Sequence, residues 1–167
     1  MIPKRNIIIP GEISSELKGL VEQRNESQGV LLYSAYPADG ELICPVFNFY
    51  KTGEGTPGHV SADERKLQAI NSFLRQNSGV YSPIIWHSHS RGTVETFGDY
   101  FARNFSQEDL RVINKRTSED PLYLAMLSTP IAHLVSGKGD VSLTFINDFE
   151  GFQERNAEIN RQLGRFE

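Results

Sequence analysis

Residues 84–89, Ile84-Ile85-Trp86-His87-Ser88-His89, form an apolar run that ends in two histidines separated by one residue. We expect this run to be a buried strand. Successive side chains of a strand point to opposite faces, so His87 and His89 share one face while Trp86 and Ser88 point to the other. Imidazole is the commonest metal ligand in proteins. Although a His-x-His pair can also be purely structural, the strand predicts part of a metal site.

The residues before this strand predict alternating strands and helices. Apolar runs, helical periodicity and turn residues indicate the following elements in chain order: a strand at 7–9, an amphipathic helix from 12 to about 24, a central strand at 29–34 that forms a hairpin with a strand at 42–50, a glycine-rich loop at 51–58, and a helix that Ser61 or Asp63 opens and that ends near 76. The fold class predicted is therefore α/β with a mixed sheet.

The residues after it continue this alternation. Four aromatic residues at helical spacing, Phe97, Tyr100, Phe101 and Phe105, predict a short helix, and 106–116 predicts another, with Leu110 and Ile113 facing inward. Three strands are expected at 122–127, 132–135 and 141–146, followed by a polar helix at 150–165 anchored by Phe152, Ile159 and Leu163. Because no repeat or linker interrupts the pattern, we expect a single domain over residues 1–167.

The composition excludes several classes of protein. A formal net charge of -4 over 167 residues gives no overall basic surface for nucleic acid. The apolar run Ile7-Ile8-Ile9 is too short for a signal peptide, and no stretch is long enough to cross a membrane. The lone Cys44 lies among apolar residues, where a buried free thiol is expected. We therefore expect a cytoplasmic protein.

A hydrolytic metal site needs more than two histidines. A catalytic zinc usually takes three protein ligands and a water, and Asp109 lies in the first turn of the expected helix 106–116, from which a carboxylate could reach the ion. A carboxylate off the metal must also accept a proton from water and return it to the leaving amine. Glu26, just before the strand at 29–34, is our candidate for that role.

Three segments together resemble the signature of the JAMM (MPN+) zinc metalloproteases. They are Glu26 ahead of a glycine-led apolar strand, His87-Ser88-His89, and Ser106-Gln107-Glu108-Asp109. The resemblance implies a single MPN (JAB1/MPN/Mov34) domain, with a mixed sheet flanked by helices as in cytidine deaminases. It also implies that His87, His89 and Asp109 bind one Zn²⁺ per chain. Glu26 would then be the general acid/base, and Ser106 would stabilise the oxyanion.

The resemblance also implies a substrate. Members of the family hydrolyse the isopeptide or peptide bond after the C-terminal Gly-Gly of ubiquitin, of ubiquitin-like proteins or of sulfur-carrier proteins. A deubiquitinase-like isopeptidase of prokaryotic or archaeal type is thus expected, with such proteins as partners, no nucleic acid or membrane partner, and a homodimer or a second MPN subunit as further options. Two other classes stay open: a non-catalytic MPN scaffold, and a zinc hydrolase of another small amide.

The chain departs from the family between the second and third motifs. Residues 90–105 make a longer spacer than is usual, and Ser90 replaces the usual proline. We treat 90–105 as an insertion that could form a flap beside the metal. It also offers Asp99 and Glu95 as other third ligands. We prefer Asp109, because Asp99 does not begin a helix and the residue three positions before it is Thr96, where the motif has a serine.

The remaining candidates have simpler interpretations. Ser106 and Asp109 are spaced as the N-cap and the first turn of a helix, which is compatible with a ligand role because capping would orient Asp109. His59 and His133 are expected away from the metal.

Overall fold

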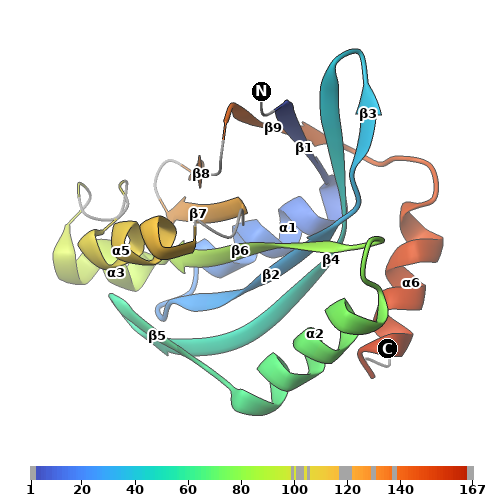
Figure 1. Cartoon of the computed structure of the whole chain (residues 1–167). Coiled ribbons are helices and arrows are strands. Elements are labelled where there is room, and N and C mark those ends of the chain that lie inside the picture. Colours follow the sequence, from blue (N-terminus) through green and yellow to red (C-terminus); the bar gives the residue numbers. More distant parts are fainter. Residues whose placement is uncertain are drawn as a thin grey trace.

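The computed structural model describes residues 3–98, 100, 104, 106–116, 122–128, 131–136 and 139–164, and for 112–116, 122–128 and 131–136 it describes the backbone alone. Figure 1 shows the elements, which are β1 (Lys4–Pro10), α1 (Gly11–Val21), β2 (Ser27–Tyr33), β3 (Tyr36–Ala38), β4 (Glu41–Thr56), β5 (His59–Ala62), α2 (Glu64–Gln76), β6 (Ser82–His89), α3 (Arg91–Phe97), α5 (Gln107–Arg116), β7 (Leu122–Ser128), β8 (Ile131–Ser136), β9 (Val141–Ile146) and α6 (Phe152–Gln162).

One mixed sheet joins the strands of the described residues. The strand order is β8-β7-β6-β2-β4-β1-β9, and β3 and β5 both pair with β4. β1 is parallel to β4 and β9, and β6 is parallel to β7, whereas β2 is antiparallel to both β4 and β6. The predicted α/β class and the antiparallel pairing of the second and third predicted strands are therefore confirmed.

The longest strand, β4, differs from its prediction. A loop was expected at 51–58, but β4 continues to Thr56 and pairs back with β5. Gly58 turns the chain between them with φ near +80°, a conformation that glycine adopts without steric cost. The glycines that suggested a loop are thus accommodated within a strand and its hairpin, and the hairpin extends the sheet beside the start of β2.

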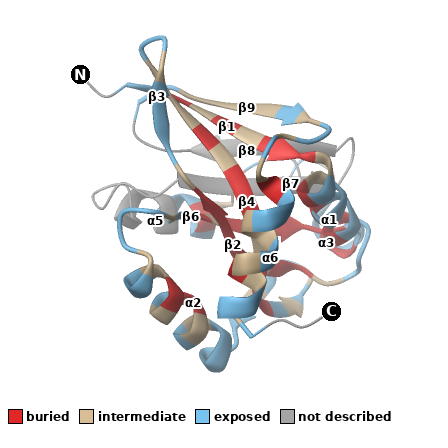
Figure 2. Cartoon of the chain, turned by 90° about the vertical axis from the view of Figure 1, so that its right-hand side faces the viewer, coloured by how far each residue is buried: buried red, intermediate tan, exposed pale blue. Residues whose placement is uncertain are grey.

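The helices α1 and α2 lie on opposite sides of the sheet (Figures 1 and 2). Figure 2 shows buried residues running along the central strands β4, β2 and β1. Trp86 on β6 is fully buried and stacks on Phe49 of β4 with a centroid separation of 4.9 Å. Gly29 makes room for this indole, because a Cβ at Gly29 would lie 2.5 Å from Trp86 Cζ2. The sheet face that carries Trp86 therefore belongs to the core.

Most predicted helix boundaries hold to within a few residues. Asp63 is the N-cap of α2 and accepts hydrogen bonds from the amides of Arg65 and Lys66, whereas Ser61, the other candidate, lies in β5. The first helix ends at Val21, earlier than the expected position near 24. In the last helix Phe152 and Ile159 are buried, as predicted.

One prediction about a side chain near the insertion is wrong. Leu110 is 45% exposed and does not face the core, because the residue of this turn that faces inward is Asp109, which lies against His87 and His89. The structure adds a helix that was not predicted, α3 at Arg91–Phe97, and Gly98, with φ near +90°, follows it. Of the helix predicted over the aromatic residues, Tyr100 is described and is helical. Phe101 and Phe105, and the side chain of Ile113, lie outside the described residues.

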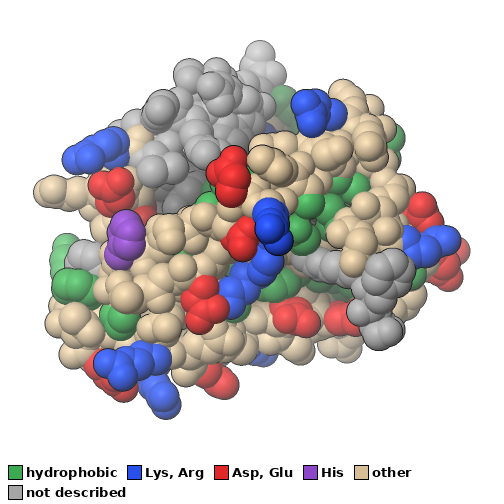
Figure 3. Space-filling view, turned by 90° about the horizontal axis from the view of Figure 1, so that it is seen from below, with side chains coloured by type: hydrophobic (Ala, Val, Ile, Leu, Met, Phe, Trp, Pro, Cys, Tyr) green, Lys and Arg blue, Asp and Glu red, His purple; other side chains and the backbone are tan. Residues whose placement is uncertain are grey.

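The surface and the single cysteine agree with the composition. Acidic and basic side chains are interspersed over the described part of the face drawn in Figure 3, without a large patch of one sign. No helix among the described residues is long and apolar enough to cross a membrane. Cys44 is a buried free thiol, as expected, and burial raises its pKa above the ordinary value.

Candidate metal centre

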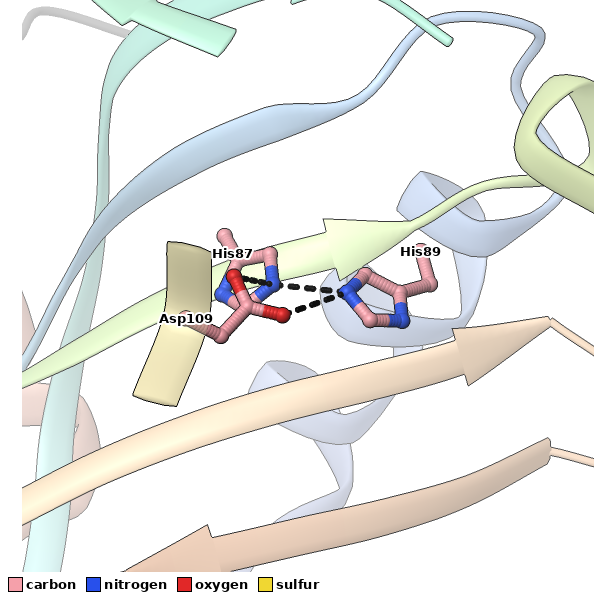
Figure 4. Close-up of side chains that lie close together, drawn as sticks. All are labelled: His87, His89 and Asp109. Atoms are coloured by element: carbon pink, nitrogen blue, oxygen red, sulfur yellow. Dashed lines mark hydrogen bonds and ion pairs between the residues drawn. The ribbon is translucent and has the colours of Figure 1, made fainter. Parts of the chain in front are cut away.

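His87 and His89 lie at the end of β6 and point to the same side of the sheet, toward Asp109 at the start of α5 (Figure 4). The two Nε2 atoms are 2.8 Å apart. Asp109 Oδ1 lies 3.1 Å from His87 Nε2, and Asp109 Oδ2 lies 3.1 Å from His89 Nε2. These residues, of which His87 and Asp109 lie 22 positions apart in the sequence, therefore form one group that could hold a metal ion.

The spacing of these atoms fits a small divalent ion. Zinc bonds of about 2.0–2.2 Å at tetrahedral angles place neighbouring ligand atoms about 3.3–3.5 Å apart. To reach that spacing, the two Nε2 atoms would separate by about 0.5–0.7 Å, and each carboxylate oxygen from its imidazole nitrogen by about 0.2–0.4 Å. Three protein ligands also leave a fourth tetrahedral position for water or substrate, as catalytic zinc sites do.

The surroundings of Asp109 favour its charged form. Asp109 is 9% exposed, and burial by itself would raise its pKa. Hydrogen bonds from His87 and His89, the charge on His87 and the amide of Ser106 outweigh burial, and they hold the pKa of Asp109 well below the ordinary value. Asp109 is thus held in its ionised form, the form that could bind a cation.

Ser106 fixes the position of Asp109 through a reciprocal cap. The Ser106 amide donates to Asp109 Oδ2 at 2.7 Å, and the Asp109 amide donates to Ser106 Oγ at 3.1 Å. The Ser106 carbonyl also accepts the first helical bond, from the Leu110 amide. This is the arrangement of a capping box, in which two amides that lack helical partners are satisfied together. The predicted N-cap is confirmed, and it orients the carboxylate toward the histidines.

Glu26 lies just before β2 and is only 4% exposed. Its segment is tied to the histidine strand, because the Ser27 amide donates to Ser88 Oγ at 2.9 Å. Register brings the same elements together: Gln28 of β2 pairs with His87 of β6. The predicted general base is therefore fixed beside the strand that carries two of the ligands.

A single cleft of about 560 Å³ contains all of the candidate site residues. Glu26, His87, His89, Ser106 and Asp109 line one part of it. Apolar residues of β2, β6 and α2 line another part: Val30, Leu67, Leu74, Pro83 and Ile85. The site therefore opens into a groove that could hold an extended, partly apolar ligand.

Two of the other sequence candidates, Glu95 and His59, are described and do not join the ligand group. Glu95 is exposed on α3 and lies 3.7 Å from Arg91. His59 is on the exposed strand β5, so it lines the cleft but is not among the metal-ligating residues of the described chain. Asp99 and the side chain of His133 lie outside the described residues. Asp109 is the third ligand that the structure supports.

Sequence reasoning missed Thr93. This residue of α3 is fully buried, and its Oγ1 donates to Glu26 Oε1 at 2.7 Å. It lies in the insertion, which has no counterpart in the shorter spacer of the JAMM signature, so the resemblance could not assign it a role. The only sequence signal was a polar residue in the short segment just after the histidine strand.

Comparisons with known proteins give a likeness of fold. No family model matches the sequence, and no curated protein is significantly similar to it. The chain resembles the solution structure of protein DSY2949 from Desulfitobacterium hafniense, with a TM-score of 0.53 over 86% of this chain and 95% of that chain. At 20% sequence identity, this likeness concerns the fold alone.

Proposed function

We propose that this chain is a zinc-dependent isopeptidase of the JAMM type, built on a single MPN domain with the cytidine-deaminase-like arrangement of sheet and helices. The observation that carries the proposal is that three metal ligands, His87, His89 and Asp109, share one cleft with a buried carboxylate off the metal, Glu26. A structural zinc site would be closed by four protein ligands, and it would need no such carboxylate.

Each side chain has a defined task in this mechanism. Bound zinc would lower the pKa of water to about 7 and polarise the scissile carbonyl. Glu26 accepts the proton of the attacking water and later delivers it to the leaving amine, as a general acid/base does. Ser106 Oγ already accepts a hydrogen bond from the Asp109 amide, so its own hydrogen can be donated to the oxyanion that forms on the substrate.

The cleft supports an extended protein tail as the substrate. Its apolar part, around Val30 and Ile85, lies along the strands and leads to the ligands. A tail that enters there would add backbone hydrogen bonds of the kind seen in strand addition, and small residues would be needed at the scissile bond. The proposed substrates are therefore ubiquitin, a ubiquitin-like protein or a sulfur-carrier protein, cleaved after the C-terminal glycine. The proposed location is the cytoplasm, whose reducing conditions suit the free Cys44.

One observation favours a second candidate, a zinc hydrolase of a small amide. The cleft volume of about 560 Å³ falls within the range of about 300–1,000 Å³ typical of small-molecule sites. The two candidates share the metal and the base, and they differ only in what occupies the groove.

The experiment combines zinc analysis with cleavage. We expect one zinc per purified wild-type chain, zinc loss in His89→Ala, and full zinc content in Glu26→Gln. Wild-type protein should cleave a ubiquitin-like fusion after Gly-Gly, and Glu26→Gln should lower kcat by about 10²–10⁴-fold, the usual contribution of a general acid/base. Cleavage of small amides but not of the fusion would favour the second candidate. If the folded wild type contained no zinc, the remaining hypothesis would be a non-catalytic scaffold.

A further inference from the structure

The first turn of α3 lies directly against the segment that carries Glu26. Ser90 Oγ donates to the Arg24 carbonyl at 2.7 Å. At Gly92 the contact is closer still, because a Cβ there would lie 1.9 Å from the same carbonyl oxygen. Glycine is required at this close approach of two backbones. The first residues of the insertion therefore contact the segment that carries Glu26.

Thr93 makes the contact that reaches the carboxylate. Its Oγ1 donates to Glu26 Oε1 at 2.7 Å, and both side chains are buried. Ser90 Oγ is 3.3 Å from Thr93 Oγ1, but the Ser90 hydrogen is already directed to the Arg24 carbonyl. A hydroxyl carries one hydrogen, so that of Thr93 is directed to Glu26. Among the described residues, none donates to the other oxygen, Glu26 Oε2.

We propose that Thr93 is a positioning residue that holds Glu26 in its catalytic orientation, an inference that rests on the proposed function of Glu26. With Oε1 held by Thr93, the carboxylate has one oxygen fixed and one oxygen, Oε2, left for proton transfer. A carboxylate that could rotate would spend part of its time away from the reacting water, and general base catalysis requires hydrogen-bond geometry. The insertion 90–105 therefore supplies part of the catalytic apparatus.

Three variants of the full chain test this assignment. Thr93→Val replaces the hydroxyl by a methyl group of similar shape, and Thr93→Ser keeps the hydroxyl. The matched control is Thr144→Val on β9, where the lost hydroxyl donates to Asn6 Oδ1 at 2.8 Å, outside the cleft. For each variant and the wild type, we would measure zinc per chain, and kcat and KM on the ubiquitin-like fusion. We would also record the side-chain carboxyl ¹³C resonance of Glu26 in zinc-free protein. This resonance is assigned by its loss in Glu26→Gln.

If Thr93 positions Glu26, Thr93→Val keeps one zinc, lowers kcat by about 10–100-fold and leaves KM within about twofold, a part of what the whole general base contributes. Thr93→Ser then restores kcat to within about threefold of the wild type. The Glu26 carboxyl resonance shifts in Thr93→Val but not in Thr93→Ser or Thr144→Val. In a Glu26→Gln background, Thr93→Val lowers kcat no further, because the group that it positions is gone.

The two levels of the proposal fail in different ways. If the wild type is active and Glu26→Gln is inactive, but Thr93→Val has wild-type kcat and an unshifted Glu26 resonance, the assignment of Thr93 is wrong and the proposed function stands. If Glu26→Gln cleaves as well as the wild type, the proposed function itself fails and the role of Thr93 falls with it. Should Thr93→Val not fold, a low kcat in folded Thr93→Ser with an unchanged Glu26 resonance would overturn the assignment, and near-wild-type values of both would support it.

Discussion

Asp109 at the start of α5 and Glu26 just before β2 are two buried carboxylates in one cleft, and their surroundings differ. Both oxygens of Asp109 lie against imidazole nitrogens, and its backbone amide donates to the capping Ser106 Oγ. Glu26 has no imidazole partner among the described residues; a hydroxyl from the insertion holds one of its oxygens. Two acidic groups in one site can therefore serve different chemistry because their neighbours differ.

Under the proposed function, this is the difference between a metal ligand and a general base. A metal ligand must present its oxygens to the ion in a fixed place, and the imidazole partners of Asp109 mark that place. A general base must keep an oxygen available for a proton, which a single hydrogen bond from a hydroxyl allows. Substitutions that act on only one of the two regions can test this division.

Asp109→Asn should have the largest effect on zinc binding. The amide keeps the shape of the side chain but loses the charge that complements the ion. Zinc at about 1,000 times its Kd should stabilise the wild type and Glu26→Gln alike by about 4 kcal/mol, while Asp109→Asn should show little of this stabilisation. Urea unfolding with and without zinc measures it. If zinc stabilised Asp109→Asn as much as the wild type, the third ligand would be another residue, and Asp99 would be the first to test.

Gly92→Ala should disturb the other region with an intermediate effect. The added Cβ would meet the Arg24 carbonyl, so α3 and the segment before Glu26 must move apart. We expect a loss of about 1–3 kcal/mol in the free energy of unfolding of zinc-free protein, the range for overpacked sites, together with a lower kcat. Zinc binding should be unchanged, because the three ligands lie elsewhere.

Gly19→Ala is the matched control for that substitution. Gly19 lies within α1, and nothing lies within 4 Å of a Cβ added there. Alanine has the higher helix propensity, so this change should leave kcat unaltered and stabilise the protein by up to about 1 kcal/mol. If Gly92→Ala behaved in the same way, the contact between α3 and the Glu26 segment would have no mechanical consequence.

Sequence reasoning was strongest where local patterns decide the structure. Strand alternation placed His87 and His89 on one face, and the spacing of Ser106 and Asp109 correctly predicted a capped helix start. It failed where distant contacts decide. The glycines of 51–58 suggested a loop, but pairing with β2 and β5 keeps Gly53 and Gly55 in β4, and only Gly58 turns the chain.

The contact between Thr93 and Glu26 could not be predicted for a similar reason. It joins residues 67 positions apart, and it depends on how the insertion folds back over Gly92. No periodicity or spacing in the sequence carries that information. The ligand region was therefore predictable as a set of local motifs, whereas the region around the base required the tertiary structure.

Apart from any loss of kcat through its proposed contact with the oxyanion, Ser106→Ala should have the smallest effect on stability and on zinc binding. It removes the hydroxyl that accepts from the Asp109 amide, and loss of such a cap costs about 1 kcal/mol in the free energy of unfolding. Asp63→Ala, at the N-cap of α2, is the control, because it removes a comparable cap outside the ligand group. Both variants should lose similar stability in urea, but only Ser106→Ala should weaken zinc binding in a chelator competition, because only that cap orients a ligand. Equal zinc affinity in the two variants would mean that the imidazole contacts alone hold Asp109 in place.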